Sequence, residues 1–259
     1  MIKNLEYEED FIELMSNLSK INKQVLITNH ENDDGTVDFN QFSIKAVSED
    51  NSIVYFLNAP KRYFNFESTS FAVIDFTRIV NYYNTFNKSV MGNKDNVDSP
   101  KLSIEYKDDT LEEAITLFID STKTKSKIKH RLANESIIER PPYNKINIPS
   151  IDAEFNLSLL EQNNLLNMIK LVDADYMKYK FYENKLNIIL GNTRSHDTYD
   201  TVFELVDFIE TPFELTTNSS GFVLMPKSDY KVKVSEKGLF MFNEMRDDDI
   251  KLTLYITRK

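Results

Sequence analysis

The 259-residue chain contains no cysteine, only five glycines, and no apolar run long enough to span a membrane. The absence of cysteine excludes disulfides and cysteine-ligated zinc, and it agrees with an intracellular compartment. The first residues, MIKNLEYEEDF, lack the apolar core of a secretion signal. We therefore expect an unsecreted protein that has no membrane partner.

Motifs of common enzymes are also missing. The sequence has no phosphate-binding or dinucleotide-binding glycine loop and no nucleophile elbow. Its histidines, His30, His130 and His196, are far apart and lack metal-ligand spacing. The stretch HENDDGTVDFNQ (30–41) resembles a calcium loop only in part, because His30 and Gln41 replace its terminal carboxylates, so we predict a polar hairpin turn. We expect a protein that is not an enzyme and that uses no cofactor and no metal.

The composition is that of a globular protein with an acidic balance. Hydrophobic residues make up 41% and aromatic residues 12%, which is enough for one large core or two ordinary ones. The net charge of −10 argues against a protein that simply coats nucleic acid, because such proteins are usually basic. It still allows a locally basic groove within an acidic exterior.

Three stretches show helical periodicity. Residues 9–22 and 75–88 are amphipathic, and a third helix follows the capping box formed by Ser158 and Glu161. Strand-like stretches rich in β-branched and aromatic residues surround them, among them 64–74, 114–121, 201–209 and 222–225. We also expect a hairpin over Glu183 and Asn184.

An unusual segment, 121–150, divides the two halves. It begins with five cations between Lys123 and Arg131 and ends with three prolines among apolar side chains. Proline disfavours a central strand, so we predict a connector between two domains, with boundaries 1–121, 122–150 and 151–259. The cations either contact a partner such as DNA or form a solvated linker, and the sequence leaves both possibilities open.

The two halves look like copies of one plan. Asn17 and Lys20 on the first helix match Asn167 and Lys170 on the third, at an offset of 150. The stretches 70–76, 101–109 and 114–120 match 221–227, 231–238 and 250–256 in type and order. An internal repeat of this kind predicts two domains of similar topology.

Three long segments carry a family resemblance: 139–170, which begins ERPPYNKINIPS, 70–86, and 222–240 together with 249–256. With these segments the chain resembles a sliding clamp, the processivity ring of replicative DNA polymerases. It resembles the bacteriophage branch, related in fold to proliferating cell nuclear antigen. The match is carried by order and length more than by identical residues.

The resemblance implies an α+β chain with the DNA clamp fold, in which two similar domains place antiparallel sheets outside and helices towards a central pore. It implies a homotrimeric ring around double-stranded DNA, contacted without sequence specificity, together with a DNA polymerase and a clamp loader as partners. The expected location is the cytoplasm of an infected bacterium. Because only Lys227, Ser228 and Asp229 follow Pro226 before the next strand, a full second pore helix is not expected in the second domain.

The resemblance also assigns residues to three surfaces. The DNA-facing set is Asn17, Lys20, Lys23, Arg78, Asn81, Lys88, Asn167 and Lys170. The pocket for partner tails is expected at Ile137, Ile138, Tyr143, Ile146, Ile148 and Ile256. The subunit interface is expected where strand 114–121 meets strand 201–209 of a neighbour, through Ile115, Leu117, Ile119, Phe203 and Leu205. The alternatives are a trimeric viral tail or baseplate protein and, with less support, a metal-dependent nuclease.

Overall fold

The computed structural model describes the whole chain except residues 33, 68–69, 91–99, 111–112, 122–124, 139–145, 247–248 and 259, and the side chains of 87–90. The chain divides into two compact units. The first combines Met1–Ala46 with Leu57–Pro142, and the second combines Val47–Phe56 with Tyr143–Lys259. No helix among the described residues is long and apolar enough to cross a membrane.

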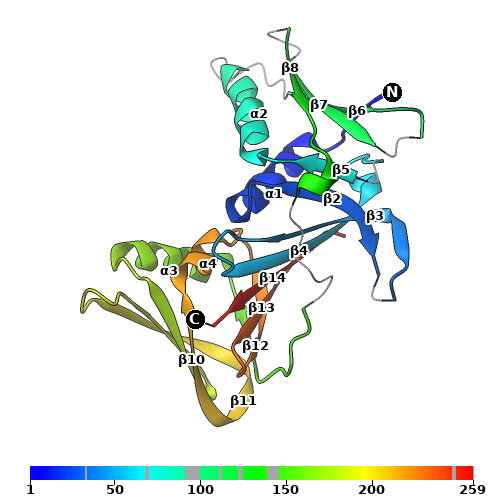
Figure 1. The fold of residues 1–259 in the computed structure, drawn as a ribbon. Coiled ribbons are helices and arrows are strands. Elements are labelled where there is room, and N and C mark those ends of the chain that lie inside the picture. Colours follow the sequence, from blue (N-terminus) through cyan, green and yellow to red (C-terminus); the bar gives the residue numbers. More distant parts are fainter. Residues whose placement is uncertain are drawn as a thin grey trace. The chain divides into compact units, whose positions relative to one another are not determined.

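Over its described residues, the first unit contains two α-helices, two short 3-10 helices and two antiparallel sheets (Figure 1). Its elements are β1 (Ile2–Asn4), α1 (Glu8–Ile21), β2 (Val25–Glu31), β3 (Val37–Val47), β4 (Ile53–Pro60), β5 (Ser70–Val73), α2 (Phe76–Val90), β6 (Lys101–Tyr106), β7 (Ala114–Ser121) and β8 (Ser126–Arg131). One sheet has the order β1-β6-β7-β8, and the other contains β5, β2, β3 and residues 57–60 of β4. Helix α1 packs against α2.

The second unit repeats this plan with merged strands. Its elements are β9 (Ala153–Leu157), α3 (Leu159–Leu171), β10 (Tyr176–Gly191), β11 (Thr198–Asn218), α4 (Ser219–Leu224), β12 (Tyr230–Ser235), β13 (Leu239–Glu244) and β14 (Lys251–Thr257). Strands β10 and β11 pair with each other, and β9-β12-β13-β14 continues to residues 53–56 of β4. The structure does not divide this region into the two strands of the predicted hairpin, because β10 runs through both Glu183 and Asn184. Glu183, with a φ of 53°, lies instead at a register shift in the pairing of β10 with β11.

The topology supports the internal repeat. In each unit a strand precedes the first helix and pairs with the strand that follows the second helix: β1 with β6, and β9 with β12. Two further strands complete each sheet, β7 and β8 in the first unit and β13 and β14 in the second. By topology, β7 corresponds to β13 and β8 to β14. The sequence match of 114–120, in β7, to 250–256, in β14, therefore joins two strands that do not correspond.

Aromatic side chains build the core of each unit. In the first, Phe11 of α1 meets Phe64 and Phe76 edge to face, with ring centroids 5.3 Å and 6.1 Å away. In the second, Phe181 stacks on Phe213 at 4.5 Å, and Tyr179 lies 4.6 Å from Phe240. Each ring buries a large apolar area, so these clusters contribute strongly to stability.

The ends of the helices in the second unit follow from local chemistry. The predicted capping box is confirmed, because the Ser158 hydroxyl accepts from the Glu161 N–H and the Glu161 carboxylate accepts from the Ser158 N–H. The predicted strand at 222–225 is wrong, since these residues end α4. Helix α4 has only six residues, which confirms that a full second helix is lacking. Buried Gln162 holds the following turn by donating to the Pro226 carbonyl at 2.9 Å and accepting from the Ser228 N–H at 3.1 Å.

A carboxylate ties the loop before β4 to the start of α4. Asp50 accepts hydrogen bonds from the hydroxyls of Ser48 and Ser52 at 2.6 Å and 2.7 Å, and from that of Ser220 at 3.0 Å. Partial burial alone would raise the pKa of Asp50, but these hydrogen bonds favour the charged form and lower it to about 2.

Because the pKa of Asp50 is lower in the folded chain, its carboxylate stabilises the fold above the unfolded pKa near 3.8, and this contribution is lost as pH falls towards 2. We expect Asp50→Asn to lower the free energy of unfolding by about 1 kcal/mol at pH 7 and to flatten its pH dependence between these values. Denaturant unfolding at a series of pH values checks this.

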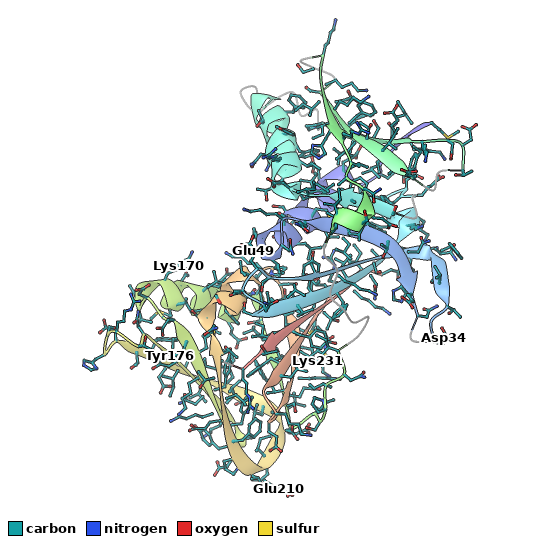
Figure 2. All side chains as sticks on the ribbon, viewed as in Figure 1. Asp34, Glu49, Lys170, Tyr176, Glu210 and Lys231 are labelled. Atoms are coloured by element: carbon teal, nitrogen blue, oxygen red, sulfur yellow. The ribbon has the colours of Figure 1, made fainter. Side chains whose placement is uncertain are left out.

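The neighbouring exposed Glu49, labelled in Figure 2, provides a matched control. Glu49→Gln should leave both the stability and its pH dependence unchanged. Equal losses in the two variants would show that the hydrogen bonds of Asp50 do not account for the effect.

Candidate functional site

Helix α1 exposes a face whose charge changes along its length. Phe11, Leu14 and Leu18 face the core, so the opposite side is free for polar groups. The first turn is acidic and the last turn contains Lys20, an arrangement that also suits the helix dipole. Lys20 is exposed and its Nζ donates to Asn17 Oδ1 at 3.0 Å. The positive charge of α1 is therefore confined to its C-terminal end.

The start of α2 lies close to that end. The Phe76 N–H donates to the Lys23 carbonyl at 2.9 Å, which joins the residue after α1 to the first turn of α2. Lys23, Arg78 and Asn81 are exposed, and Arg78 Nε lies 3.2 Å from Asp75 Oδ2. The side chain of Lys88 is outside the described part of the chain. Three predicted DNA-facing cations, Lys20, Lys23 and Arg78, thus belong to neighbouring turns of the first unit.

Helix α3 exposes a much less charged face. Asn167 and Lys170 are exposed as predicted, and Figure 2 shows Lys170 on the outer side of the helix. In the same helix, Leu160 is 71% exposed and Leu171 is 76% exposed. Lys170 is the only cation within α3. The second unit therefore offers fewer charges for phosphate contacts than the first.

The basic run between 123 and 131 is neither a linker nor a free cationic arm over its described length. Ser126–Arg131 forms β8, paired with β7, so part of the predicted connector belongs to the sheet of the first unit. Lys127 and Lys129 lie 4.0 Å and 5.6 Å above the ring of Phe118. They also pair with Asp120 at 3.3 Å and Glu105 at 3.7 Å. Their charges are therefore partly neutralised by the sheet.

Strand β8 ends its sheet, and no strand among the described residues pairs with its other edge. The Leu132 N–H donates to the Ile115 carbonyl at 3.0 Å, which places Leu132 in a hydrogen-bonded pair with β7. In an antiparallel pair the hydrogen-bonded residues alternate, so the backbone groups of Lys127, Lys129 and Arg131 point away from β7. We call these three residues the free edge of β8.

This edge corrects the predicted subunit interface. Strand β7 is flanked by β6 and β8, so it has no open edge for a neighbour. Leu117 and Ile119 are fully buried, and Ile115 is half-buried. The expectation that 114–121 pairs with another subunit is therefore wrong, and β8 is the strand of this sheet that is available.

The second strand of the predicted interface, 201–209, lies within β11. Phe203 and Leu205 are each only 8% exposed, so the expectation that they contact another subunit is also corrected. The exposed apolar side chains are Val202, Val206 and Phe208, with exposures of 53%, 55% and 66%. The backbone between Glu204 and Ile209 has no partner residue in β10, because the register shifts there.

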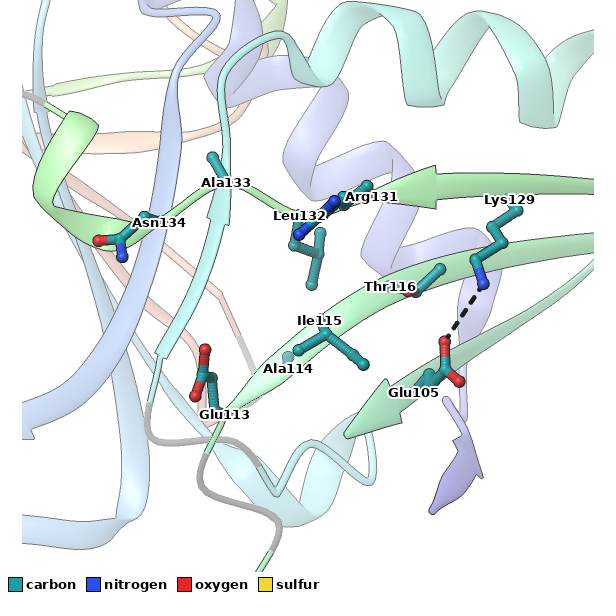
Figure 3. Close-up of a pocket in the computed structure, with 10 residues that line it drawn as sticks. All are labelled: Glu105, Glu113, Ala114, Ile115, Thr116, Lys129, Arg131, Leu132, Ala133 and Asn134. Carbon is teal, nitrogen blue, oxygen red and sulfur yellow. Dashed lines mark ion pairs between the residues drawn. The ribbon is translucent and has the colours of Figure 1, made fainter. Parts of the chain in front are cut away.

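Two hollows flank the end of β8, both within the first unit. The first is shown in Figure 3 and has a volume of about 490 Å³. Ile115 and Ala114 line it together with charges of both signs, including the Lys129–Glu105 ion pair. Its mixed charges give it no preference for anions or cations.

The second hollow, of about 540 Å³, is mainly cationic. Ile74, Leu132 and Ala133 form its apolar part, and its charged and titratable groups are Lys23, Asp75, Arg78, His130 and Arg131. Burial lowers the pKa of His130, the charge of Arg78 lowers it further, and Asp75 acts in the opposite direction. Neutral His130 leaves three cations against one acid, and we call this site the cationic hollow.

The structure supports only some of the residues predicted for the partner pocket as exposed enough to bind a partner. Ile138 is 7% exposed and packs with Leu26 and Ala72, and Ile256 of β14 is 2% exposed, so both are core residues instead of docking residues. Ile137 is 60% exposed, while Ile146 and Ile148 are half-buried. Tyr143 lies outside the described residues. A docking role for the remaining isoleucines stays a prediction.

The calcium-like stretch forms a hairpin turn between β2 and β3. Asp34 accepts from both the N–H and the hydroxyl of Thr36, at 2.9 Å and 2.6 Å, so its carboxylate is used within the turn. Within the described part of the chain, no three histidines or acids come together in a way that could hold a metal ion.

Sequence reasoning missed β8, and with it the meeting of Arg131 and His130 with the helix cations. The alternation in SKIKHR (126–131), in which Ile128 and His130 face the core side and lysines face out, was the available signal. It was overlooked because lysine is uncommon in strands and the run was interpreted by its charge.

No family model matches the sequence, and no curated protein does either. Solved structures match over the full length. Proliferating cell nuclear antigen from Entamoeba histolytica has a TM-score of 0.71 at 11% identity, with 100% of this chain and 98% of that chain covered. The A. fulgidus antigen, solved with the C-terminal region of FEN-1, gives 0.69 at 12%, with 100% and 98% covered. The antigen of Thermococcus kodakaraensis gives 0.68 at 14%, with 100% and 99% covered.

At sequence identities this low, the comparisons support a shared architecture but no correspondence between individual residues. The agreement nevertheless extends over both units of the chain and nearly all of each known structure. Together with the duplicated topology, it shows that this chain has the DNA clamp fold of the proliferating cell nuclear antigens.

Proposed function

We propose that the chain is the subunit of a sliding clamp that encircles double-stranded DNA and tethers a polymerase. The observation that carries the proposal is the full-length likeness to clamp subunits, with at least 98% of each known chain covered. A viral tail protein or a nuclease has no comparable support. The resemblance in sequence favours a bacteriophage clamp that acts in the cytoplasm of an infected bacterium and is placed on DNA by a loader.

The internal repeat supports a specific way of closing a ring. In the second unit, β14 lies beside residues 53–56 of β4, so its edge is covered within the chain. Strand β8 holds the equivalent place in the first unit, and its edge is open. Since β4 and β5 in the first unit correspond to β11 in the second, the strand expected to cover β8 is the first part of β11 from another copy. Three copies joined in this way form the proposed homotrimer.

A sliding clamp needs few and non-specific phosphate contacts, because many strong contacts would immobilise it. Each phosphate neutralised on B-DNA adds roughly 0.9 to the slope of log K against log salt. Lys20 and Lys170 are exposed on α1 and α3 without a described acidic partner, beside Asn17 and Asn167. These side chains suit weak contacts that exchange as the ring moves.

We expect Lys20→Gln with Lys170→Gln to weaken retention on nicked circular DNA and to reduce the salt slope by about 0.9 for each phosphate that is no longer neutralised. Cosedimentation of the loaded ring with DNA over a range of salt concentrations measures both. Lys231→Gln, on strand β12, is the control, since Lys231 pairs with Glu154 at 2.7 Å. Retention equal to that of the unchanged protein would place the DNA contacts elsewhere.

The apolar end of the connector is the proposed docking strip for partner tails. The A. fulgidus antigen was solved with the C-terminal region of FEN-1, which shows that one clamp of this fold holds a partner's tail. In the present chain, half-buried Ile146 and Ile148 alternate with exposed Asn147 and Pro149. Extended backbone with alternate apolar side chains can capture a short peptide.

We expect Ile146→Ser with Ile148→Ser to weaken binding of the cognate polymerase's C-terminal peptide by at least tenfold, because the apolar area that the peptide would cover is removed. Fluorescence anisotropy with the labelled peptide measures this affinity. Phe39→Ser is the control, since Phe39 is 68% exposed on β3 of the other unit. Unchanged affinity in the double variant, with its melting temperature preserved, would reject the docking strip.

A further inference from the structure

A stacked pair of tyrosines at the surface of the first unit, Tyr7 and Tyr63, belongs to none of the sites described above. Tyr7 immediately precedes α1 and is 58% exposed. Its ring stacks on that of Tyr63, with centroids 4.9 Å apart and an interplanar angle of 17°. Tyr63 in turn meets the fully buried ring of Phe64 edge to face at 4.8 Å. The pair, which we call the tyrosine step, therefore extends the aromatic core to the surface.

Tyrosine is an unfavourable residue for the backbone position that Tyr7 occupies. Its φ of 50° and ψ of 47° are left-handed, a conformation that suits glycine or asparagine and is strained for a bulky side chain. Tyr7 is also the N-cap of α1, where a serine, threonine, asparagine or aspartate would bond the free N–H groups, but its side chain forms no such bond. Local stability therefore does not account for a tyrosine here, and residues that conflict with local rules are typical of functional positions.

Contacts with the segment around Tyr63 hold this conformation. The Glu6 N–H donates to the Phe64 carbonyl at 3.1 Å, which joins the residue before Tyr7 to the residue after Tyr63. The Tyr63 hydroxyl donates to Asp10 Oδ2 at 3.2 Å, which fixes a carboxylate beside the two rings. The tyrosine step and the Asp10 carboxylate are therefore presented together.

The surface around the tyrosine step is acidic. Residues 6–13, EYEEDFIE, contain five acids and no lysine or arginine. Glu6 and Asp10 are exposed, and within the described residues neither forms an ion pair. Their charges are therefore available to a cation from outside the chain.

A buried hydroxyl next to the same turn of α1 also lacks a partner. Tyr83 of α2 is 2% exposed, and its hydroxyl forms no hydrogen bond in the part of the chain that the structure describes. Burial raises the pKa of Tyr83, and the negative charges of Glu9 and Glu8 raise it further. The field of this turn is therefore negative on the side that faces α2 as well as at the surface, which favours a cationic ligand.

A flat aromatic face beside a carboxylate fits a guanidinium group. Arginine stacks its planar head on a tyrosine ring and at the same time donates N–H groups in that plane to a carboxylate. A lysine ammonium would pair with Asp10 but has no plane to stack. A nucleotide base could stack on Tyr7, but its phosphates would be repelled by the acids around the step. Arginine is therefore the side chain that uses both the ring and the charge.

We propose that the tyrosine step binds an arginine side chain in a basic segment of a partner protein. The guanidinium lies on the exposed face of Tyr7 and donates to the carboxylate of Asp10, and Glu6 attracts the other cations of the segment. The proposal goes beyond the proposed clamp function, because neither the DNA contacts nor the docking strip use these residues. It adds a docking surface that is aromatic and acidic, whereas the docking strip is apolar.

Matched peptides test the tyrosine step. The probe is a short fluorescein-labelled peptide of alternating glycine and arginine, compared with peptides that carry lysine or uncharged citrulline in place of arginine. Fluorescence anisotropy at low salt gives the three affinities. We expect the arginine peptide to bind about threefold more tightly than the lysine peptide, because only arginine stacks, and the citrulline peptide to bind most weakly. Equal affinities for the arginine and lysine peptides would overturn the proposal.

The variant Tyr7→Asn separates binding from folding. Asparagine tolerates the left-handed backbone and is favoured at an N-cap, so the melting temperature should stay the same or rise. The variant should nevertheless lose the preference for arginine over lysine, whereas Tyr7→Phe should keep it because the ring remains. Asp10→Asn, which leaves both rings in place, should weaken binding of the arginine peptide and serves as the second test if Tyr7→Asn lowers the melting temperature. A folded variant without the Tyr7 ring that keeps the preference would refute the tyrosine step.

Two matched controls exclude general attraction to an acidic protein. Tyr82→Ala removes a 37% exposed ring of α2 outside the step, and Glu210→Gln removes an exposed acid of β11. Both should leave the affinity for the arginine peptide and its preference over lysine unchanged. Losses in these controls as large as those in Tyr7→Asn and Asp10→Asn would show that the peptide binds the acidic surface as a whole, against the proposal.

Discussion

The free edge of β8 is the constraint on which the rest of the molecule depends. Backbone N–H and C=O groups that point out of a sheet need partners, and an open edge also invites uncontrolled pairing with other chains. In this strand the three residues whose backbone groups point outward are two lysines and an arginine. Their charges disfavour pairing with a second identical edge and favour a strand of opposite charge.

The charges of the chain follow from the same requirement. A net charge of −10 would repel DNA if it were spread evenly, yet Lys23, Arg78 and Arg131 of the first unit line one hollow. The lysine charges on β8 are partly neutralised by Asp120 and Glu105, so their electrostatic attraction acts only over a short distance. Strand β11, by contrast, contains acids and no lysine or arginine, and Glu210 is one of these acids, at the tip seen in Figure 2. The acidic total and the basic patches are therefore compatible in one molecule.

Local chemistry explains what could be predicted from the sequence. The amphipathic helices and the Ser158–Glu161 capping box depend on residues within a few positions of one another, and both are confirmed. Strand β7 was predicted with its correct bounds because its apolar run is continuous. The fold class could also be reached, since the order of elements in each half is visible in the pattern.

What could not be predicted depends on contacts between distant residues. Which strand of a sheet is last depends on pairing, so β7 was assigned an edge that belongs to β8. Ile138 and Ile256 were predicted to line a pocket for partner tails, but Ile138 packs with Leu26 and Ala72, and Ile256 is 2% exposed. Helix α4 was missed because six residues are too few to show helical periodicity, and its end is set by Gln162, more than 60 positions earlier.

The duplicated fold, with the edge of β8 uncovered, accounts for the proposed ring better than the charges of the chain alone. If both units were complete, β14 and β8 would each have a neighbouring strand within the chain, and the protein would gain nothing by associating. Within the described residues only β14 has such a neighbour, because residues 53–56 of β4 lie beside it. In the proposed ring the corresponding strand for β8 comes from another copy, so each added copy again leaves one edge open. A chain of copies with this property has no open edge only when it closes on itself. The proposed closed ring is therefore the arrangement that would complete the sheet of every unit of the duplicated fold.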